Sequence, residues 1–97
     1  MAKYEVAFVF FIEREDTNRK NALVSDLNRI NPITVSDIYD DGEDWNVECI
    51  AEFECNAKGH IDRALDHKLA TLLKGKTYAA MDYHYMKGID NDFYWHP

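Results

Sequence analysis

Between Ile30 and Ala57 the sequence contains no lysine and no arginine, although the chain has 11 basic residues in all. The chain has a net charge of −7, and outside this stretch the basic and acidic residues almost balance. The acid excess therefore falls in one contiguous segment. Its acidic members are Asp37, Asp40, Asp41, Glu43, Asp44, Glu48, Glu52 and Glu54. Such a segment repels a phosphate backbone, which argues against direct nucleic-acid binding through it and favours a basic partner.

Long apolar runs are also missing. The longest, Val6 to Ile12, is far shorter than a membrane span, and no signal-peptide pattern opens the chain. Only two cysteines occur, Cys49 and Cys55. On one strand they would lie about 20 Å apart, too far for a disulfide, so we expect buried free thiols. These absences predict a cytoplasmic protein with no membrane partner.

Motifs of catalysis and of cofactor binding are lacking. The four glycines are not clustered as in a phosphate-binding loop, and no Gly-x-Ser-x-Gly motif is present. The four histidines do not have the spacing of a metal site, and the acidic turn near Gly42 does not follow the calcium-loop pattern. The sequence therefore predicts a protein that is not an enzyme, with no cofactor and no metal.

What the sequence does contain is a clear succession of strands and helices. Apolar residues alternate over residues 3–12 and 45–55, and β-branched residues mark 33–39, with a bulge expected near Asp37. Leucines at helical spacing predict a helix that ends before Pro32, capped by Asp16 or Thr17, and a second that begins after Asn56 and ends near Gly75. Residues 77–86 form the predicted fourth strand.

This order predicts an α+β fold, a ferredoxin-like βαββαβ sandwich. Its four-stranded antiparallel sheet has the spatial order 4-1-3-2, with both helices on one face. Residues 1–87 make one domain, and residues 88–97 form an aromatic tail that packs on the fold or at an interface. The predicted core comprises Phe8, Phe10, Leu27, Val47, Phe53, Leu65, Leu69 and Leu72.

The open face of the predicted sheet carries acids where RNA-recognition modules of this topology place aromatic and basic residues. Our functional hypothesis is a small acidic binding module that occupies a basic surface of a protein or nucleoprotein complex. Virus-encoded inhibitors and nucleic-acid mimics share this profile. The hypothetical interface is the hairpin from Asp37 to Glu54, whose closely spaced acids have no evident folding role.

Two other interpretations stay open. The acidic hairpin can be a solvated face that keeps the protein soluble. Alternatively, the chain is a small-molecule enzyme or ligand sensor that dimerises through the open face, with Val9, Phe11, Ile50, Tyr78 and Met86 as apolar contacts. In that case Asp82, Tyr83 and His84 would be its polar candidates. The sequence is compatible with a monomer or a homodimer.

Overall fold

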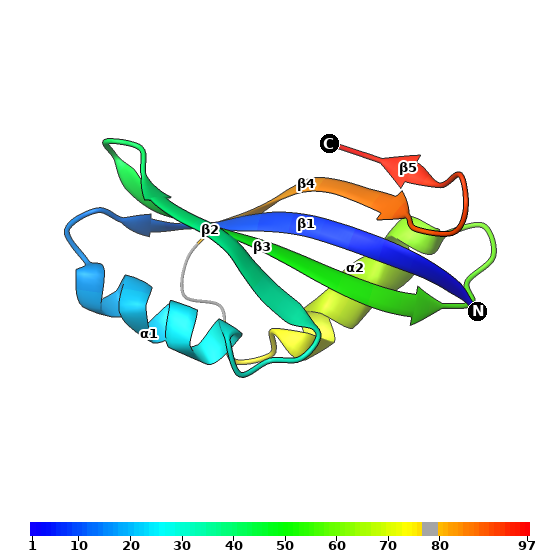
Figure 1. Ribbon diagram of the computed structural model, residues 1–97, viewed down its shortest axis with the longest axis horizontal. Helices are drawn as coiled ribbons and strands as arrows, with labels where there is room; N and C mark the ends of the chain where they lie inside the picture. The colour runs from blue at the N-terminus through cyan, green and yellow to red at the C-terminus, as the bar shows by residue number, and fades with distance from the viewer. Residues whose placement is uncertain (77–79) are drawn as a thin grey trace.

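The computed structural model describes residues 1–76 and 80–97. Its elements follow in the order β1 (Ala2–Glu13), α1 (Thr17–Leu27), β2 (Ile33–Asp40), β3 (Asp44–Cys55), α2 (Ile61–Leu72), β4 (Ala80–Gly88) and β5 (Tyr94–Trp95). All strand pairs are antiparallel, and the sheet order is β2-β3-β1-β4-β5 (Figure 1).

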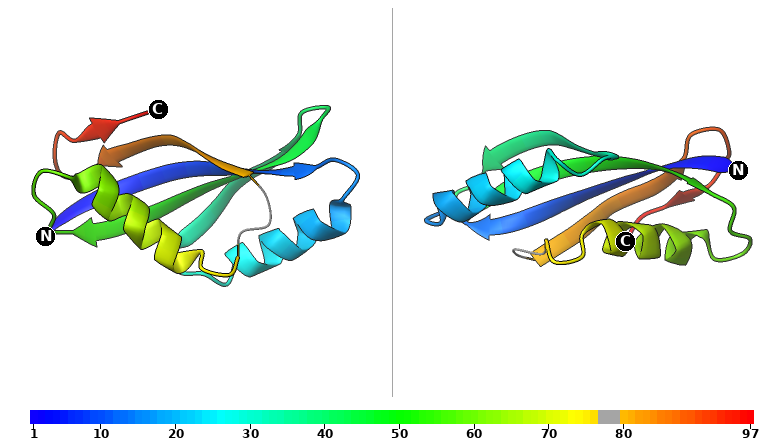
Figure 2. Two further views of the ribbon diagram at one scale, coloured as in Figure 1. Left: turned by 180° about the vertical axis from the view of Figure 1, so that it is seen from behind. Right: turned by 90° about the horizontal axis from the view of Figure 1, so that it is seen from below.

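The predicted four-stranded ferredoxin-like sandwich is therefore wrong. The sheet has five strands, because the tail turns back and Tyr94–Trp95 pairs with Met86 and Lys87 at the outer edge of β4. In addition, the two helices follow each other along the long axis of the molecule and do not lie side by side (Figure 2). Tyr78, which the alternative hypothesis uses as an apolar contact, lies outside the described residues.

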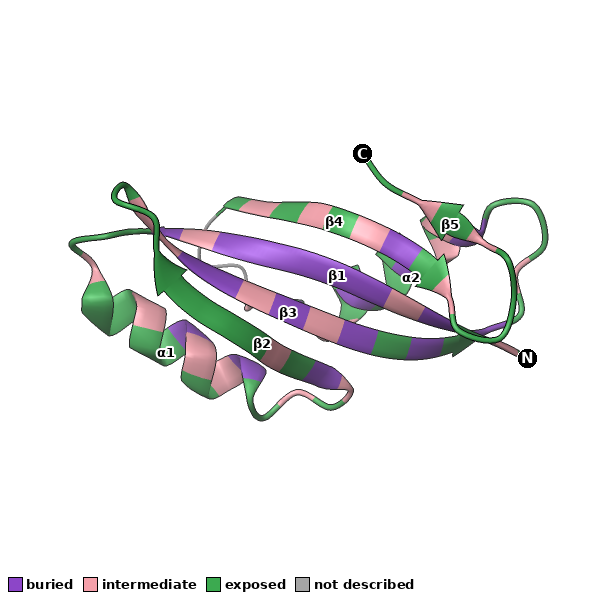
Figure 3. Cartoon of the chain, turned by 45° about the horizontal axis from the view of Figure 1, so that its top comes forward, coloured by how far each residue is buried: buried purple, intermediate pink, exposed green. Residues whose placement is uncertain are grey.

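Strand β1 organises the sheet. It pairs with β3 from Ala2 to Glu13 and with β4 from Tyr4 to Phe11, so its backbone groups are bonded on both sides. Figure 3 shows it buried along most of its length, whereas β2 is mainly exposed. The bulge expected near Asp37 is present, since the register of β2 against β3 shifts between Val35 and Asp37.

The core lies between the sheet and the two helices. Even-numbered residues of β1 and odd-numbered residues of β3 meet Leu23 and Leu27 of α1 and Leu65 and Leu69 of α2. All predicted core residues are buried except Leu72, which is half-buried, while Leu73 is buried after the end of the helix.

The two cysteines are buried and free. Asp16 caps α1 by accepting from the N–H of Arg19 at 3.2 Å.

The second helix begins later than expected. His60, not Asn56, stands at the N-cap position of α2 and makes no side-chain cap hydrogen bond. Beyond its end Gly75 has φ +76°, the left-handed conformation that the sequence predicted for this glycine. No helix in the described part of the chain is both long and apolar enough to cross a bilayer.

The tail packs on its own sheet. Gly88 donates its N–H to the carbonyl of Phe93 at 2.7 Å, and a Cβ at Gly88 would collide with the side chain of Asn91. The ring of Phe93 then lies edge-on to Tyr4 at 5.7 Å, and Trp95 lies edge-on to Tyr83 at 6.2 Å. A glycine at this position therefore allows the tight reversal that creates β5.

Removing core side chains tests the position of the core. Phe10 and Leu69 are both fully buried, so Phe10→Ala or Leu69→Ala should each cost roughly 2–5 kcal/mol through the cavity left behind. Denaturant unfolding measures this cost. An unchanged midpoint in either variant would contradict the described core.

Deleting Asp92 to Pro97 tests the fifth strand. The truncation removes the aromatic contacts of Phe93 and Trp95 with Tyr4 and Tyr83, so the melting temperature should fall by about 5 °C or more. Circular dichroism on heating gives the comparison. A truncated protein that melts with the wild type would show that the tail adds nothing to the fold.

Candidate functional site

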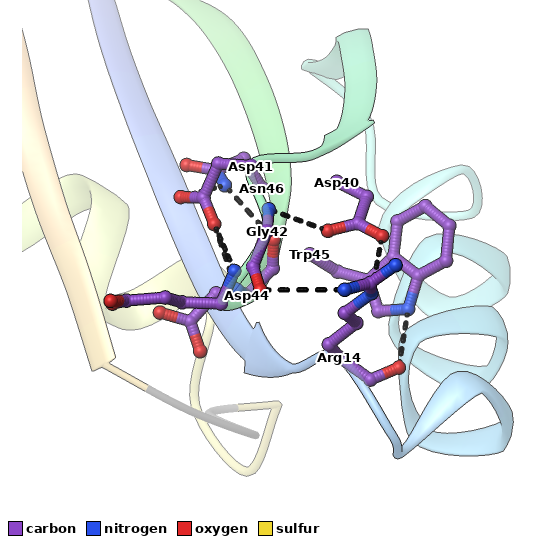
Figure 4. Close-up of polar contacts among 8 residues, drawn as sticks. Arg14, Asp40, Asp41, Gly42, Asp44, Trp45 and Asn46 are labelled. Atoms are coloured by element: carbon purple, nitrogen blue, oxygen red, sulfur yellow. Dashed lines mark hydrogen bonds and ion pairs between the residues drawn. The ribbon is translucent and has the colours of Figure 1, made fainter.

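The tip of the hairpin between β2 and β3 is built by aspartates. Gly42 has φ +100°, and its N–H donates to Asp40 Oδ1 at 2.8 Å. Asp41 Oδ1 accepts from the N–H groups of Glu43 and Asp44 at 2.9 and 2.8 Å, while Asn46 Nδ2 donates to Asp41 Oδ2 at 2.8 Å (Figure 4). The carboxylates of Asp40 and Asp41 thus satisfy the turn's own donors.

Those bonds favour the charged form of Asp41. The pKa of Asp41 falls from 3.8 to about 2 because its carboxylate accepts these hydrogen bonds. The largest effect comes from the N–H of Asp44, followed by the amide of Asn46 and the N–H of Glu43. The expectation that the acids of this hairpin have no folding role is therefore wrong for Asp41. Local hydrogen bonding offsets the repulsion from its neighbours.

Arg14 ties the hairpin tip to the connection between β1 and α1. Its Nε lies 2.8 Å from Asp40 Oδ2, its Nη1 donates to the carbonyl of Gly42 at 3.5 Å, and its N–H donates to the carbonyl of Glu43 at 3.3 Å. In return, Trp45 Nε1 donates to the carbonyl of Arg14 at 3.1 Å (Figure 4). Sequence reasoning missed Arg14 because it lies outside the segment whose charges were counted.

Lys20 adds a second basic contact from α1. Its ammonium lies 4.3 Å from the centre of the Trp45 ring, in the geometry of a cation–π interaction. Together, Arg14 and Lys20 bring positive charge to one side of an acidic tip that the sequence alone suggested was unopposed. The hairpin is therefore anchored at its tip as well as through its strands.

The open face of the sheet, opposite the helices, carries the other acids. Even-numbered residues of β3 point to this face, and Glu52 and Glu54 among them are exposed. In the described residues no ion pair or side-chain hydrogen bond is recorded for either carboxylate. Glu48, on the same face, is half-buried, and its Oε1 lies 3.6 Å from His84 Nε2 on β4.

Two acidic pairs face each other directly across this surface. Glu5 of β1 is opposite Glu52, and Asp37 of β2 is opposite Glu48. Lys87 lies 3.3 Å from Glu5 and offsets that charge, but in the described residues no basic group lies within ion-pair distance of Asp37. Like charges in directly opposite positions destabilise a sheet.

Tyr39 is an exposed residue of β2, at the edge of this acidic surface. The pKa of its hydroxyl is raised, first by partial removal from water and then by the charges of Glu48, Asp37 and Asp41. Each of these acids disfavours a further negative charge at the same edge.

The predicted interface residues therefore separate into two groups. Turn acids, at the tip, are Asp40, Asp41, Glu43 and Asp44. Face acids, on the open face of β2 and β3, are Asp37, Glu48, Glu52 and Glu54. The structure places both groups along one hairpin, but hydrogen bonds and the Arg14 ion pair occupy Asp40 and Asp41.

Metal-ligating and acid–base side chains occur along the whole of the described residues. No group of three or more His, Cys, Asp or Glu side chains among them could hold a metal ion. Burial, followed by the charge of Glu48, raises the pKa of the Cys49 thiol to about 12, which keeps it protonated at neutral pH. Tyr83 donates a short hydrogen bond to Asp66, and burial is the main cause of its raised pKa.

No family model, curated protein or solved structure matches this chain.

Replacing Asp41 tests its structural role. Asp41→Asn retains one acceptor but places an amide donor against Asn46, so the melting temperature at pH 7 should fall. Because the folded pKa of Asp41 lies below its ordinary value of 3.8, the carboxylate stabilises the fold above about pH 4. This contribution is lost as pH falls towards 2, and the two melting curves should converge there.

Glu43→Gln is the matched control, since no side-chain hydrogen bond is recorded for Glu43 in the described chain. Its melting temperature should follow that of the wild type across the whole pH range. A difference between Asp41→Asn and wild type that persists unchanged at pH 2 would rule out the charged turn as its cause.

Proposed function

We propose that this protein is a binding module that occupies a positively charged surface of a protein or nucleoprotein complex through the acidic open face of its sheet. The observation that carries the proposal is the position of the face acids. They project from adjacent strands on one side of the molecule, and in three of the four the side chain is exposed.

The spacing of these charges favours recognition of an extended basic surface. Side chains two residues apart on β3 are separated by about 6.8 Å. The phosphates of one DNA strand are about 3.4 Å apart, so the charges of Glu52 and Glu54 are spaced at about half the linear charge density of that strand. A surface that binds nucleic acid is a suitable partner, and blocking it would make the protein an inhibitor. Direct binding to nucleic acid is disfavoured by the same charges.

The turn acids have a different role in this proposal. Asp40 and Asp41 fix the hairpin tip through their hydrogen bonds and through Arg14. The tip and the face are thereby held as one preformed surface, which reduces the ordering entropy lost on binding. We assign the contact itself chiefly to the face acids.

The alternative, an enzyme or sensor that dimerises through the open face, is less well supported. Val9 is only 2% exposed, and Met86 faces the core. Neither residue offers apolar contact area to a second copy. Dimerisation would also bury the exposed carboxylates of Glu52 and Glu54, which is costly unless basic side chains such as Lys3 or Lys87 pair with them.

Charge reversal on the face tests the proposal. Glu52→Lys combined with Glu54→Lys should fold normally, because both side chains are exposed, and should reduce partner binding about tenfold or more. Glu15→Lys combined with Asp92→Lys makes the same charge change away from the face and should bind as wild type does. Capture of partners from cells, at about 0.05 and 0.5 M salt, compares the three proteins.

The captured protein that counts is one that both wild type and the Glu15→Lys, Asp92→Lys control bind at low salt and release at high salt. If the face variant retains it equally well, or if salt has no effect on wild type, the face acids are only solvated charges.

A further inference from the structure

A hollow of about 370 Å³ opens on the acidic face between β2 and β4. Its apolar lining residues are Ala7, Cys49 and Ile50, and its polar ones are Ser36, Glu48, His84 and Tyr85. The volume lies in the lower part of the range for small ligand sites. Because Ala7 pairs with Ile50 on one side and with Tyr85 on the other, the hollow crosses the central strand of the sheet.

Tyr85 forms a fixed wall of the hollow. Its hydroxyl donates to Glu5 Oε2 at 2.7 Å, and its ring stacks on Tyr94 with a centroid distance of 6.3 Å. The hydrogen bond to Glu5, followed by desolvation, raises the pKa of the Tyr85 hydroxyl from 10 to about 12. The wall therefore exists before any ligand binds.

Glu48 is the charged acceptor at the hollow. Its carboxylate lies 3.6 Å from His84 Nε2, which exceeds an ordinary hydrogen-bond length. Asp37 stands opposite Glu48 and adds negative charge from β2. The hollow thus combines an apolar floor, an aromatic wall and a carboxylate, and a ligand with an aliphatic stem and a cationic head is complementary to all three.

We propose that this hollow receives one arginine side chain of the basic partner, with its stem over Ala7 and Ile50 and its guanidinium on Glu48. The proposal deepens the proposed function and rests on it. Arginine fits better than lysine because its planar head binds a carboxylate through two N–H groups, can donate a further bond to a hydroxyl such as that of Ser36, and loses less hydration. A compact ammonium gains only the charge.

Hexa-arginine and hexa-lysine peptides, which carry equal charge, separate this site from general attraction. Calorimetric titration of the intact protein at low salt should show hexa-arginine binding about fivefold more tightly. Glu48→Gln should abolish that preference. The matched variant Glu54→Gln removes the same charge outside the hollow and should weaken both peptides alike, so that the ratio is kept.

A nuclear magnetic resonance titration with hexa-arginine locates the site, and the largest amide shifts should fall on Ala7, Ile50 and Tyr85. Equal binding of the two peptides to wild type would overturn the arginine site while leaving the acidic face as the proposed binding surface. So would an arginine preference that survives Glu48→Gln. If neither peptide binds, the site and the proposed function both fail.

Discussion

The two-sided pairing of β1 is the constraint on which the other features depend. Both edges of β1 are paired, with β3 on one side and β4 on the other, along most of its length. Its side chains therefore alternate between the two faces of the sheet, the even-numbered ones toward the helices and the odd-numbered ones away from them. The register then fixes which residues of the neighbouring strands share each face. Both the core and the acidic surface follow from this single alignment, and a slip by one residue would exchange them.

Much of this arrangement could be predicted from the sequence, because period-two alternation assigns faces directly. Phe8, Phe10, Val47 and Leu69 are buried as predicted, and the β2 bulge lies where the alternation of β2 breaks. The fifth strand was missed because two residues are too few to show a period. Its signals were the turn residues after Gly88 and the aromatic character of the tail, which indicated packing but not pairing.

The site was harder to predict than the fold, since a charge count says nothing of partners. Eight acids in one segment looked equivalent, yet Asp41 bonds to backbone N–H groups while Glu54 stands exposed in solvent. The sequence pattern Asp-Asp-Gly indicated a turn. It could not show that Arg14, far away along the chain, would reach across to Asp40. Contacts of this kind depend on the tertiary structure.

The closure of the tail onto the first strand bears on how the chain is made in a cell. The N–H of Lys3 donates to Asp90 Oδ1 at 3.0 Å across 87 positions of sequence, and the carbonyl of Lys3 accepts from Ile89. Because β4 follows β1 only after both helices and two other strands, the two edges of β1 cannot both be paired until β4 has been synthesised. During synthesis the edge of β1 that later pairs with β4 therefore stays exposed until β4 has been made.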